Sequence, residues 1–218
     1  MIKKVLRKFF LRLNKYKKQK SINRLMLSLP NLCCKYENLL QNKVVDYGTG
    51  NSLIIEEGGS LTNCNVSFYG TNCILHIGKN VALSDNDFWF EDDGGSIVIG
   101  DGTTTESGCK FASCEGKRIE IGRDCMFSHD IDVRNTDSHS ILNEKGERIN
   151  PSADITIGEH VWVGVRSTIL KGSVIPSNTI VAAQSLVTNS LKASEHTLIA
   201  GIPAEVRKTN ISWTRERL

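Results

Sequence analysis

The sequence lacks any apolar run long enough for a membrane-spanning helix or a signal peptide. Its seven cysteines are an odd number, with no CxxC pair and no spacing typical of zinc ligands. We therefore expect reduced thiols that act as small apolar packing residues in a cytoplasmic protein. With 218 residues, the chain is long enough for one ample domain.

Acidic residues are absent from residues 1–24, which hold ten of the 27 Lys and Arg; the rest of the chain has 17 basic and 24 acidic residues. Apolar side chains in residues 1–16 recur at helical spacing between the basic ones, which predicts a basic amphipathic helix. Such a helix fits peripheral contact with the inner membrane. Packing on the rest of the protein and docking of an acidic polysaccharide are the alternatives. We assign residues 1–47 to this helix and a linker.

A six-residue period runs through residues 157–191. An aliphatic residue recurs at every sixth position, and a small or β-branched residue follows four positions later in all but the last repeat. Period six places these residues on no single helical face, so it argues against a helix and favours a β-solenoid with three hexads per triangular coil. The aliphatic series is Ile157, Val163, Ile169, Ile175, Val181 and Val187.

The same phase extends upstream in coils of 22 residues. The local text repeats in register as "LHIG", "IVIG", "IEIG" and "ITIG". On the third side of the first two coils, the phase places Ser67 and Trp89 at inward positions. We predict an all-β solenoid over residues 48–200, followed by a C-terminal extension over residues 201–218.

One insertion interrupts the solenoid. The coil that starts at residue 121 is followed by residues 139–156 where four extra residues would suffice. The body of this segment, "LNEKGERINPSAD", is polar and contains a Lys-Gly turn signal, so we expect an external loop. Long loops on rigid scaffolds are often functional, which makes His139 at the loop root a catalytic candidate.

Several stretches together resemble the hexapeptide-repeat acyltransferases, left-handed β-helix enzymes that use acetyl-CoA. More narrowly, "VRNTDSHSI", "GERIN", "ITIGEHVWVG", "STILKG" and "IAGIPAEVRKTNISW" are similar to bacterial O-acetyltransferases of capsular polysaccharide, including sialic acid capsule enzymes. The resemblance covers roughly residues 50–212. It implies a left-handed coil, acetyl-CoA as co-substrate, no metal, and a homotrimer with active sites between adjacent prisms. The expected reaction is acetyl transfer to a sugar hydroxyl of a capsule or O-antigen.

By this resemblance His139 is the general base, and an imidazole pKa of ~6.5 suits that role. Asp137 either orients the His139 ring, meets the acceptor, or forms a turn with its own backbone. His129 is a rival base that could share the same cleft, and we assign it a substrate-contact or structural role. Asn135, in the same motif, is assigned to substrate binding.

The resemblance implies that Trp162 lines the pocket for the acetyl group and the acceptor. The alternative is that Trp162 packs against a neighbouring subunit. A backbone N–H near Gly164 is a candidate donor to the oxyanion. Ala183 and Thr188 match cofactor-contacting positions of related enzymes. The basic positions of those enzymes fall on Asn189 and Glu205, so other side chains must supply charge to the CoA phosphates. The candidates for that charge are Lys171, Lys192, Arg207 and Lys208.

Other functions remain open from the sequence. An N-acetyltransferase of a nucleotide-linked amino sugar or of a xenobiotic would share the fold. A non-catalytic, membrane-tethered binding solenoid is a third hypothesis. A metal site of His129, His139 and His160 is disfavoured, because the solenoid carbonic anhydrases carry two His five residues apart and this chain has no such pair.

Overall fold

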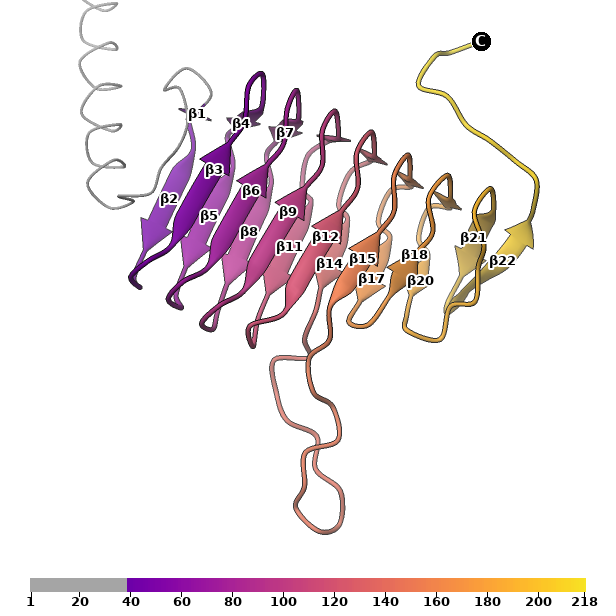
Figure 1. Ribbon diagram of the computed structural model, residues 1–218. Helices are drawn as coiled ribbons and strands as arrows, with labels where there is room; N and C mark the ends of the chain where they lie inside the picture. Colours follow the sequence, from indigo (N-terminus) through magenta and orange to yellow (C-terminus); the bar gives the residue numbers. More distant parts are fainter. Residues whose placement is uncertain (1–38) are drawn as a thin grey trace, which may run out of the picture.

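The computed structural model describes residues 39–218, which form a parallel β-solenoid of short strands in three sheets (Figure 1). This confirms the predicted left-handed β-helix fold class. The first sheet contains β3 (Ser52–Ile55), β6 (Ile74–Ile77), β9 (Ser96–Ile99), β12 (Arg118–Ile121), β15 (Ile155–Ile157) and β18 (Val174–Ile175). The second contains β1 (Leu39–Leu40), β4 (Ser60–Thr62), β7 (Ala82–Ser84), β10 (Thr104–Thr105), β13 (Met126–Phe127), β16 (Trp162–Val163), β19 (Ile180–Val181), β21 (Leu198–Gly201) and β22 (Ala204–Lys208). The third contains β2 (Lys43–Asp46), β5 (Asn65–Phe68), β8 (Asp87–Phe90), β11 (Lys110–Ser113), β14 (Asp132–Arg134), β17 (Thr168–Leu170) and β20 (Leu186–Val187).

The chain visits the three sheets in turn, so each strand pairs with its equivalent one coil away. Ile55 pairs with Ile77 and Ile99 with Ile121, which reproduces the predicted 22-residue coil. Pairing of β1 with β4 and of β2 with β5 shows that the solenoid begins before residue 48, where we expected it to start. The last hairpin, β21–β22, is antiparallel and ends the stack.

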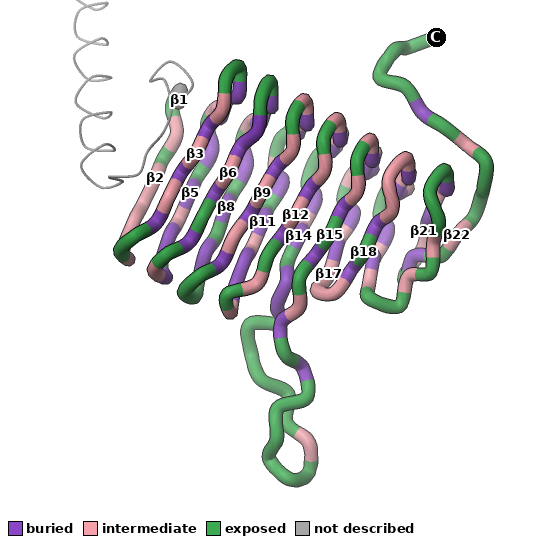
Figure 2. The backbone as a smooth tube through the Cα atoms, viewed as in Figure 1, coloured by how far each residue is buried: buried purple, intermediate pink, exposed green. Residues whose placement is uncertain are grey.

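The inward residues form one continuous apolar column (Figure 2). The aliphatic series of residues 157–187 is buried throughout, as the six-residue period predicts. On the third sheet the prediction was wrong in the first two coils. Val66 and Phe68 point inward in place of Ser67, and Phe88 and Phe90 point inward in place of Trp89. The reason is that five residues, not six, separate the inward residues of the second and third sheets there.

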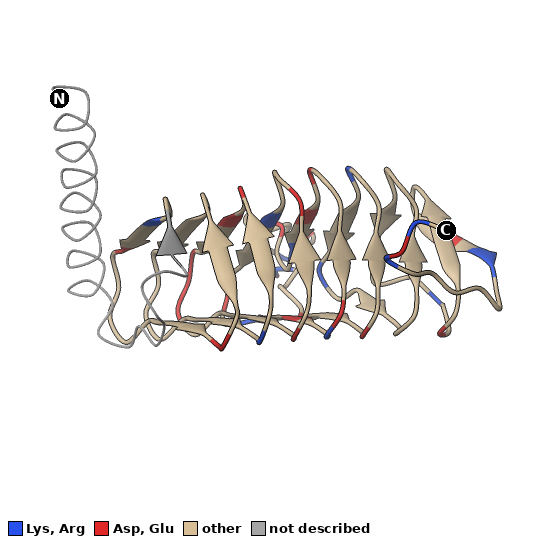
Figure 3. Ribbon diagram, turned by 90° about the horizontal axis from the view of Figure 1, so that it is seen from above, with Lys and Arg blue, Asp and Glu red and all other residues tan. Residues whose placement is uncertain are grey.

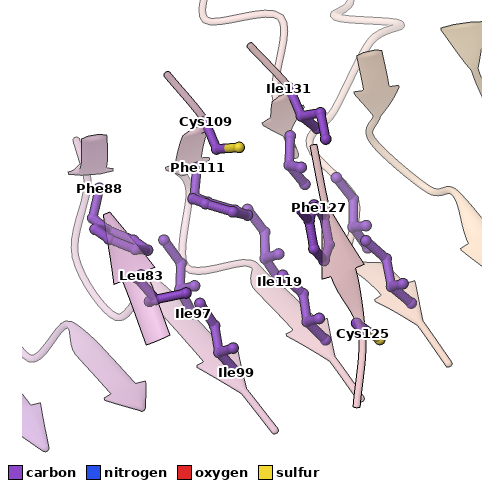
Figure 4. Close-up of a cluster of buried hydrophobic side chains, with 14 of the residues drawn as sticks. Leu83, Phe88, Ile97, Ile99, Cys109, Phe111, Ile119, Cys125, Phe127 and Ile131 are labelled. Atoms are coloured by element: carbon purple, nitrogen blue, oxygen red, sulfur yellow. The ribbon is translucent and has the colours of Figure 1, made fainter. Parts of the chain in front are cut away.

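Buried phenylalanine side chains pack inside the prism, against the inner face of the third sheet (Figure 4). Phe88 stacks on Phe111 with ring centroids 5.2 Å apart, and Phe111 meets Phe127 edge to face at 6.0 Å. The five described cysteines are free and buried, and burial raises the pKa of the Cys109 and Cys125 thiols to about 11. These thiols therefore act as small apolar packing groups.

The expected basic helix of residues 1–24 lies outside the described residues and stays a prediction, as does its membrane contact. Within residues 39–218, no helix is long and apolar enough to cross a bilayer.

Candidate functional site

The external loop leaves the solenoid at a corner between the third and first sheets (Figure 1). Ser138 has a φ of 63°, a left-handed conformation that costs energy for residues other than glycine. It is the fifth residue at this corner with that conformation, so the chain keeps the solenoid path as far as Ser138 and departs at His139. The corner series, spaced by 22, is Gly50, Asn72, Gly94, Gly116 and Ser138.

His139 stands on a tight turn, because its backbone N–H donates to the Asp137 carbonyl at 2.7 Å. The Ser138 N–H donates to Thr136 Oγ1 at 3.0 Å and holds the turn from its other side. The His139 side chain is exposed. This arrangement offers an imidazole to a ligand from a fixed backbone position, as general base chemistry requires.

Asn150, the last residue of "GERIN", closes the root of the loop. Its side-chain amide is buried and donates to Asp137 Oδ2 at 2.8 Å and to the His139 carbonyl at 2.9 Å. Its Oδ1 accepts the backbone N–H of Ile141 at 2.7 Å. One side chain thus joins the two ends of the insertion on both sides of His139. We had not singled out Asn150 from the sequence, although it lies in a matched motif.

Asp137 is held by two neighbours. The Lys171 ammonium pairs with its carboxylate and donates a second hydrogen bond to the Asn150 carbonyl at 3.0 Å. Hydrogen bonds from Lys171 and then from Asn150 lower the pKa of Asp137 below its usual range. The carboxylate is therefore committed to the turn under His139. Lys171, which we had assigned to the CoA phosphates, pairs with Asp137 in this chain, and its contact with CoA stays a prediction.

An ion pair braces the loop against the preceding coil. Arg148 donates to both Glu115 carboxylate oxygens, at 2.6 and 3.0 Å, and to the Asn150 carbonyl at 3.3 Å. The hydrogen bonds from Arg148 lower the pKa of Glu115 to about 2. Because Arg148 contacts both carboxylate oxygens of Glu115, the pair fixes where the loop emerges.

This brace predicts a pH dependence. The folded-state pKa of Glu115 lies below its unfolded value, so its contribution to stability is present above about pH 4.5 and is lost as pH falls through about 2. We expect the difference in free energy of unfolding between wild type and Glu115→Gln to be constant above about pH 5 and to shrink below it. Urea titrations at a series of pH values measure this difference, and a gap independent of pH would contradict the brace.

The other predicted residues are split between two edges of the prism. Lys171 and Thr188 follow third-sheet strands and share the edge of His139. Gly164 and Ala183 follow second-sheet strands and lie along the edge between the second and third sheets. There the coils touch closely, since a Cβ on Gly164 would lie 2.6 Å from the Ala183 backbone nitrogen.

His129 lies on that second edge. Its ring contacts Glu106 at 2.7 Å and Ser107 at 3.1 Å, in the preceding coil. Within one chain His129 and His139 therefore lie on different edges of the prism, and a cleft shared between two copies stays a prediction. Asn135 is fully buried, and its Oδ1 accepts the Cys114 N–H at 2.9 Å. It supports the corner from inside, and its assignment to substrate binding stays a prediction.

Trp162 lies on the outer face of the second sheet, and the C-terminal residues cross above it. Trp213 lies 6.1 Å from Trp162 and stacks on the His160 ring at 4.1 Å. Farther along, Arg215 donates to Asp124 at 2.9 Å. The Trp162 indole N–H is buried and has no partner among residues 39–218. This crossing was not expected, although Trp213 ends a matched motif. Lys208 is exposed at the end of β22.

A groove runs along the outer face of the third sheet up to the root of the loop. Its volume is about 600 Å³, which falls within the range of ligand-binding pockets. Thr136 and Ser138 line one end, and Lys43 lines the other. Trp89 and Tyr69 lie in the wall between these ends. We call this feature the third-sheet groove. Among the described residues, no group of three His, Cys, Asp or Glu is placed to hold a metal ion.

Comparisons with known proteins find polysialic acid O-acetyltransferases. The polysialic acid O-acetyltransferase of Neisseria meningitidis is 38% identical over 126 residues, which is 57% of this chain and 58% of the relative. The polysialic acid O-acetyltransferase of Escherichia coli O1:K1 is 32% identical over 56% of this chain and 39% of its own length. The matched segment thus spans about half the length of these curated relatives. No protein-family model matches.

The solved structure of the polysialic acid O-acetyltransferase OatWY is 30% identical, with a TM-score of 0.69 over 83% of this chain and 91% of that chain. The chain therefore belongs to the hexapeptide-repeat acetyltransferases, in the same family as the bacterial polysialic acid O-acetyltransferases.

Proposed function

We propose that this protein is an acetyl-CoA-dependent O-acetyltransferase that acts on a sugar hydroxyl of a bacterial surface polysaccharide. The observation that carries the proposal is His139, exposed on a turn that Asn150 and Lys171 hold from below. The relatives named polysialic acid O-acetyltransferase support the acceptor class, because their own names specify a sugar polymer, polysialic acid.

In the proposed reaction, His139 accepts the proton of the acceptor hydroxyl as its oxygen attacks the thioester carbonyl of acetyl-CoA. The carbonyl oxygen then carries negative charge, and a backbone N–H near Gly164 is a candidate donor to it. Collapse of this intermediate breaks the carbon–sulfur bond, and the proton held by His139 passes to the departing CoA sulfur. Transfer is direct, so the buried cysteines need no nucleophilic role.

For acetyl-CoA we retain Trp162, Gly164, Ala183, Thr188 and Lys208 as contact residues. Ala183 is exposed and Thr188 is half-buried, so both are accessible to a ligand. Lys171, which pairs with Asp137 in this chain, and Lys208 are the candidate cations for the CoA phosphates.

The division of these residues between two prism edges supports a site shared by two copies. His139 lies on the edge after the third sheet, whereas Gly164 and Ala183 lie on the edge before it, next to the face of Trp162. One straight prism cannot bring both edges to one ligand. A ring of three copies would place the first edge of one copy beside the second edge of the next. We therefore propose a homotrimer.

Subunit mixing tests the shared site. We expect His139→Ala and Trp162→Ala to be nearly inactive alone, whereas coexpressed subunits with separate tags should regain about a quarter of the wild-type activity, because that fraction of random interfaces has both residues intact. A matched control mixes His139→Ala with His139→Gln, which should restore nothing. Failure of the first pair to recover activity, with both variants folded, would place each site within one chain.

The activity itself is tested with the full-length wild-type protein, acetyl-CoA and polysialic acid. We expect release of CoA thiol and new O-acetyl signals in the NMR spectrum of the polymer. Amino sugar nucleotides in parallel reactions test the N-acetyltransferase alternative. If the folded protein released no CoA with any of these acceptors, the proposed function would be contradicted.

A further inference from the structure

The last residues of the chain cross the outer face of the second sheet, and we call residues 211–217 the C-terminal strap. Figure 3 shows this end of the chain turning back over the coils. The Trp213 ring is 9% exposed and stacks on the His160 ring. Its indole N–H donates to the His160 carbonyl at 2.9 Å, and its own carbonyl lies 3.2 Å from His160 Nε2. Three separate contacts thus hold Trp213 against one residue of the solenoid.

Arg215 fastens the strap to the coils farther back along the stack. Its guanidinium donates to Asp124 Oδ1 at 2.9 Å, to the Cys125 carbonyl at 2.8 Å and to Thr104 Oγ1 at 2.9 Å. The other oxygen of Asp124 contacts His160 Nδ1 at 2.6 Å, so one carboxylate joins the two anchor points. The strap is therefore tied to three successive coils, and its side chains have fixed positions.

Trp162 depends on packing for its orientation. Its indole N–H is buried and has no hydrogen-bond partner among residues 39–218, so no bond at that nitrogen fixes the rotation of the ring. The Trp213 ring contacts it with centroids 6.1 Å apart and planes tilted by 46°. Aromatic pairs attract each other at such distances. Trp213 therefore restrains the Trp162 ring from the side of the strap.

The strap reaches the proposed active site through Trp162 and not through a prism edge of that site. His160 lies at the corner between the first and second sheets, whereas His139 and Gly164 follow the third and second sheets at the other two corners. Trp162 stands between the corners of His160 and Gly164. In the proposed trimer the corners of His139 and Gly164 meet neighbouring copies, so the strap stays outside these interfaces.

We propose that Trp213 is a positioning residue for acetyl transfer, which holds Trp162 in the orientation that binds acetyl-CoA. This inference rests on the proposed function and gives the C-terminal strap a part in it. When a binding group spends only a fraction of its time in the competent orientation, the apparent affinity falls by that fraction. Loss of Trp213 should therefore weaken acetyl-CoA binding. Bound acetyl-CoA then orders Trp162 itself, so the rate of the bound complex should hardly change.

The test compares the kinetics of wild type, Trp213→Ala and Trp213→Phe. We expect KM for acetyl-CoA to rise about five- to tenfold in Trp213→Ala, with kcat within about twofold of wild type. Phenylalanine should restore most of the affinity, because it keeps a ring against Trp162. A purely structural loss would instead lower the amount of folded enzyme, and with it the apparent kcat, at an unchanged KM.

Arg123→Ala is the matched control. Arg123 is near the same corner and forms an exposed ion pair with Glu159. Its removal should change neither constant. If Trp213→Ala does not fold, Arg215→Ala takes its place, since it loosens the strap and leaves both tryptophans in the chain. Arg215→Ala should raise KM by a smaller factor, and an unchanged KM would overturn the positioning.

A double-mutant cycle shows whether Trp213 acts through Trp162. Calorimetry measures acetyl-CoA binding without an acceptor. Trp213→Ala should weaken this binding in the wild-type background and add nothing in the Trp162→Ala background. Equal weakening in both backgrounds, or an unchanged KM in folded Trp213→Ala, would overturn the positioning.

The same calorimetry separates this inference from the proposed function. If wild type transfers no acetyl group to any acceptor, the proposed function fails, and binding alone decides the positioning. Wild type should then bind acetyl-CoA more tightly than Trp213→Ala does. Equal binding by the two proteins, or none by wild type, would overturn the role of Trp213.

Discussion

His139→Ala should lower kcat for acetyl transfer by about 10²- to 10⁴-fold, the range typical of a lost general base. The alanine removes the group that accepts the hydroxyl proton. It leaves the turn intact, because Asn150 holds the backbone carbonyl of residue 139 and not its ring. KM for acetyl-CoA should stay within a few fold. Steady-state kinetics with wild type and variant measure both constants.

His129→Ala is the control for this experiment. Its ring also forms polar contacts at the surface of a coil, but on the other edge of the prism. We expect its kcat to fall much less than that of His139→Ala. Near wild-type turnover of His139→Ala on an acceptor that wild type acetylates would remove His139 as the base. A larger loss in His129→Ala would transfer that role to His129.

Phe111→Ala should lower the free energy of unfolding by about 3–5 kcal/mol. The ring is 1% exposed and contacts Phe88 in the coil before and Phe127 in the coil after. Its removal leaves a cavity at the level where the third-sheet groove meets the coil of the loop, and the surrounding backbone ladders limit collapse. Urea unfolding followed by circular dichroism measures the change.

Val174→Ala is the matched control, because Val174 is 60% exposed on the first sheet. Its effect should stay within about 0.5 kcal/mol, as for most surface substitutions. If Phe111→Ala were as mild as this control, the phenylalanines would not be what holds successive coils together. The two variants also separate stability from catalysis, since neither residue lies in the proposed active site.

The repeat was predictable because each inward residue meets the same environment once per coil. A solenoid is therefore visible in its sequence as a repeating period. The aliphatic residues from Ile157 to Val187 occupy the predicted inward positions. The prediction failed at Ser67 and Trp89, where one residue fewer precedes the third sheet. A shift of one residue reverses the facing of every side chain in a strand, so a small change in spacing exposed Trp89.

The candidate site was predictable only in part. His139 was found because an insertion breaks the period, and the matched motif assigns it a role. Asn150 and Arg148 were not found, because their partners lie up to 33 residues away and are chosen by the path of the loop. The same holds for Trp213, which contacts His160 from 53 residues away.

The sequence by itself determined the coil length, the inward residues of most strands and the position of the insertion, since all three follow from local periodicity. The tertiary structure decided which prism edge carries each predicted residue, and it separated His139 from Gly164 and Ala183. It also decided that Lys171 binds Asp137 and that Asn135 is buried. These outcomes depend on how coils stack and where the loop returns, which are contacts between residues distant in the chain that no local pattern encodes.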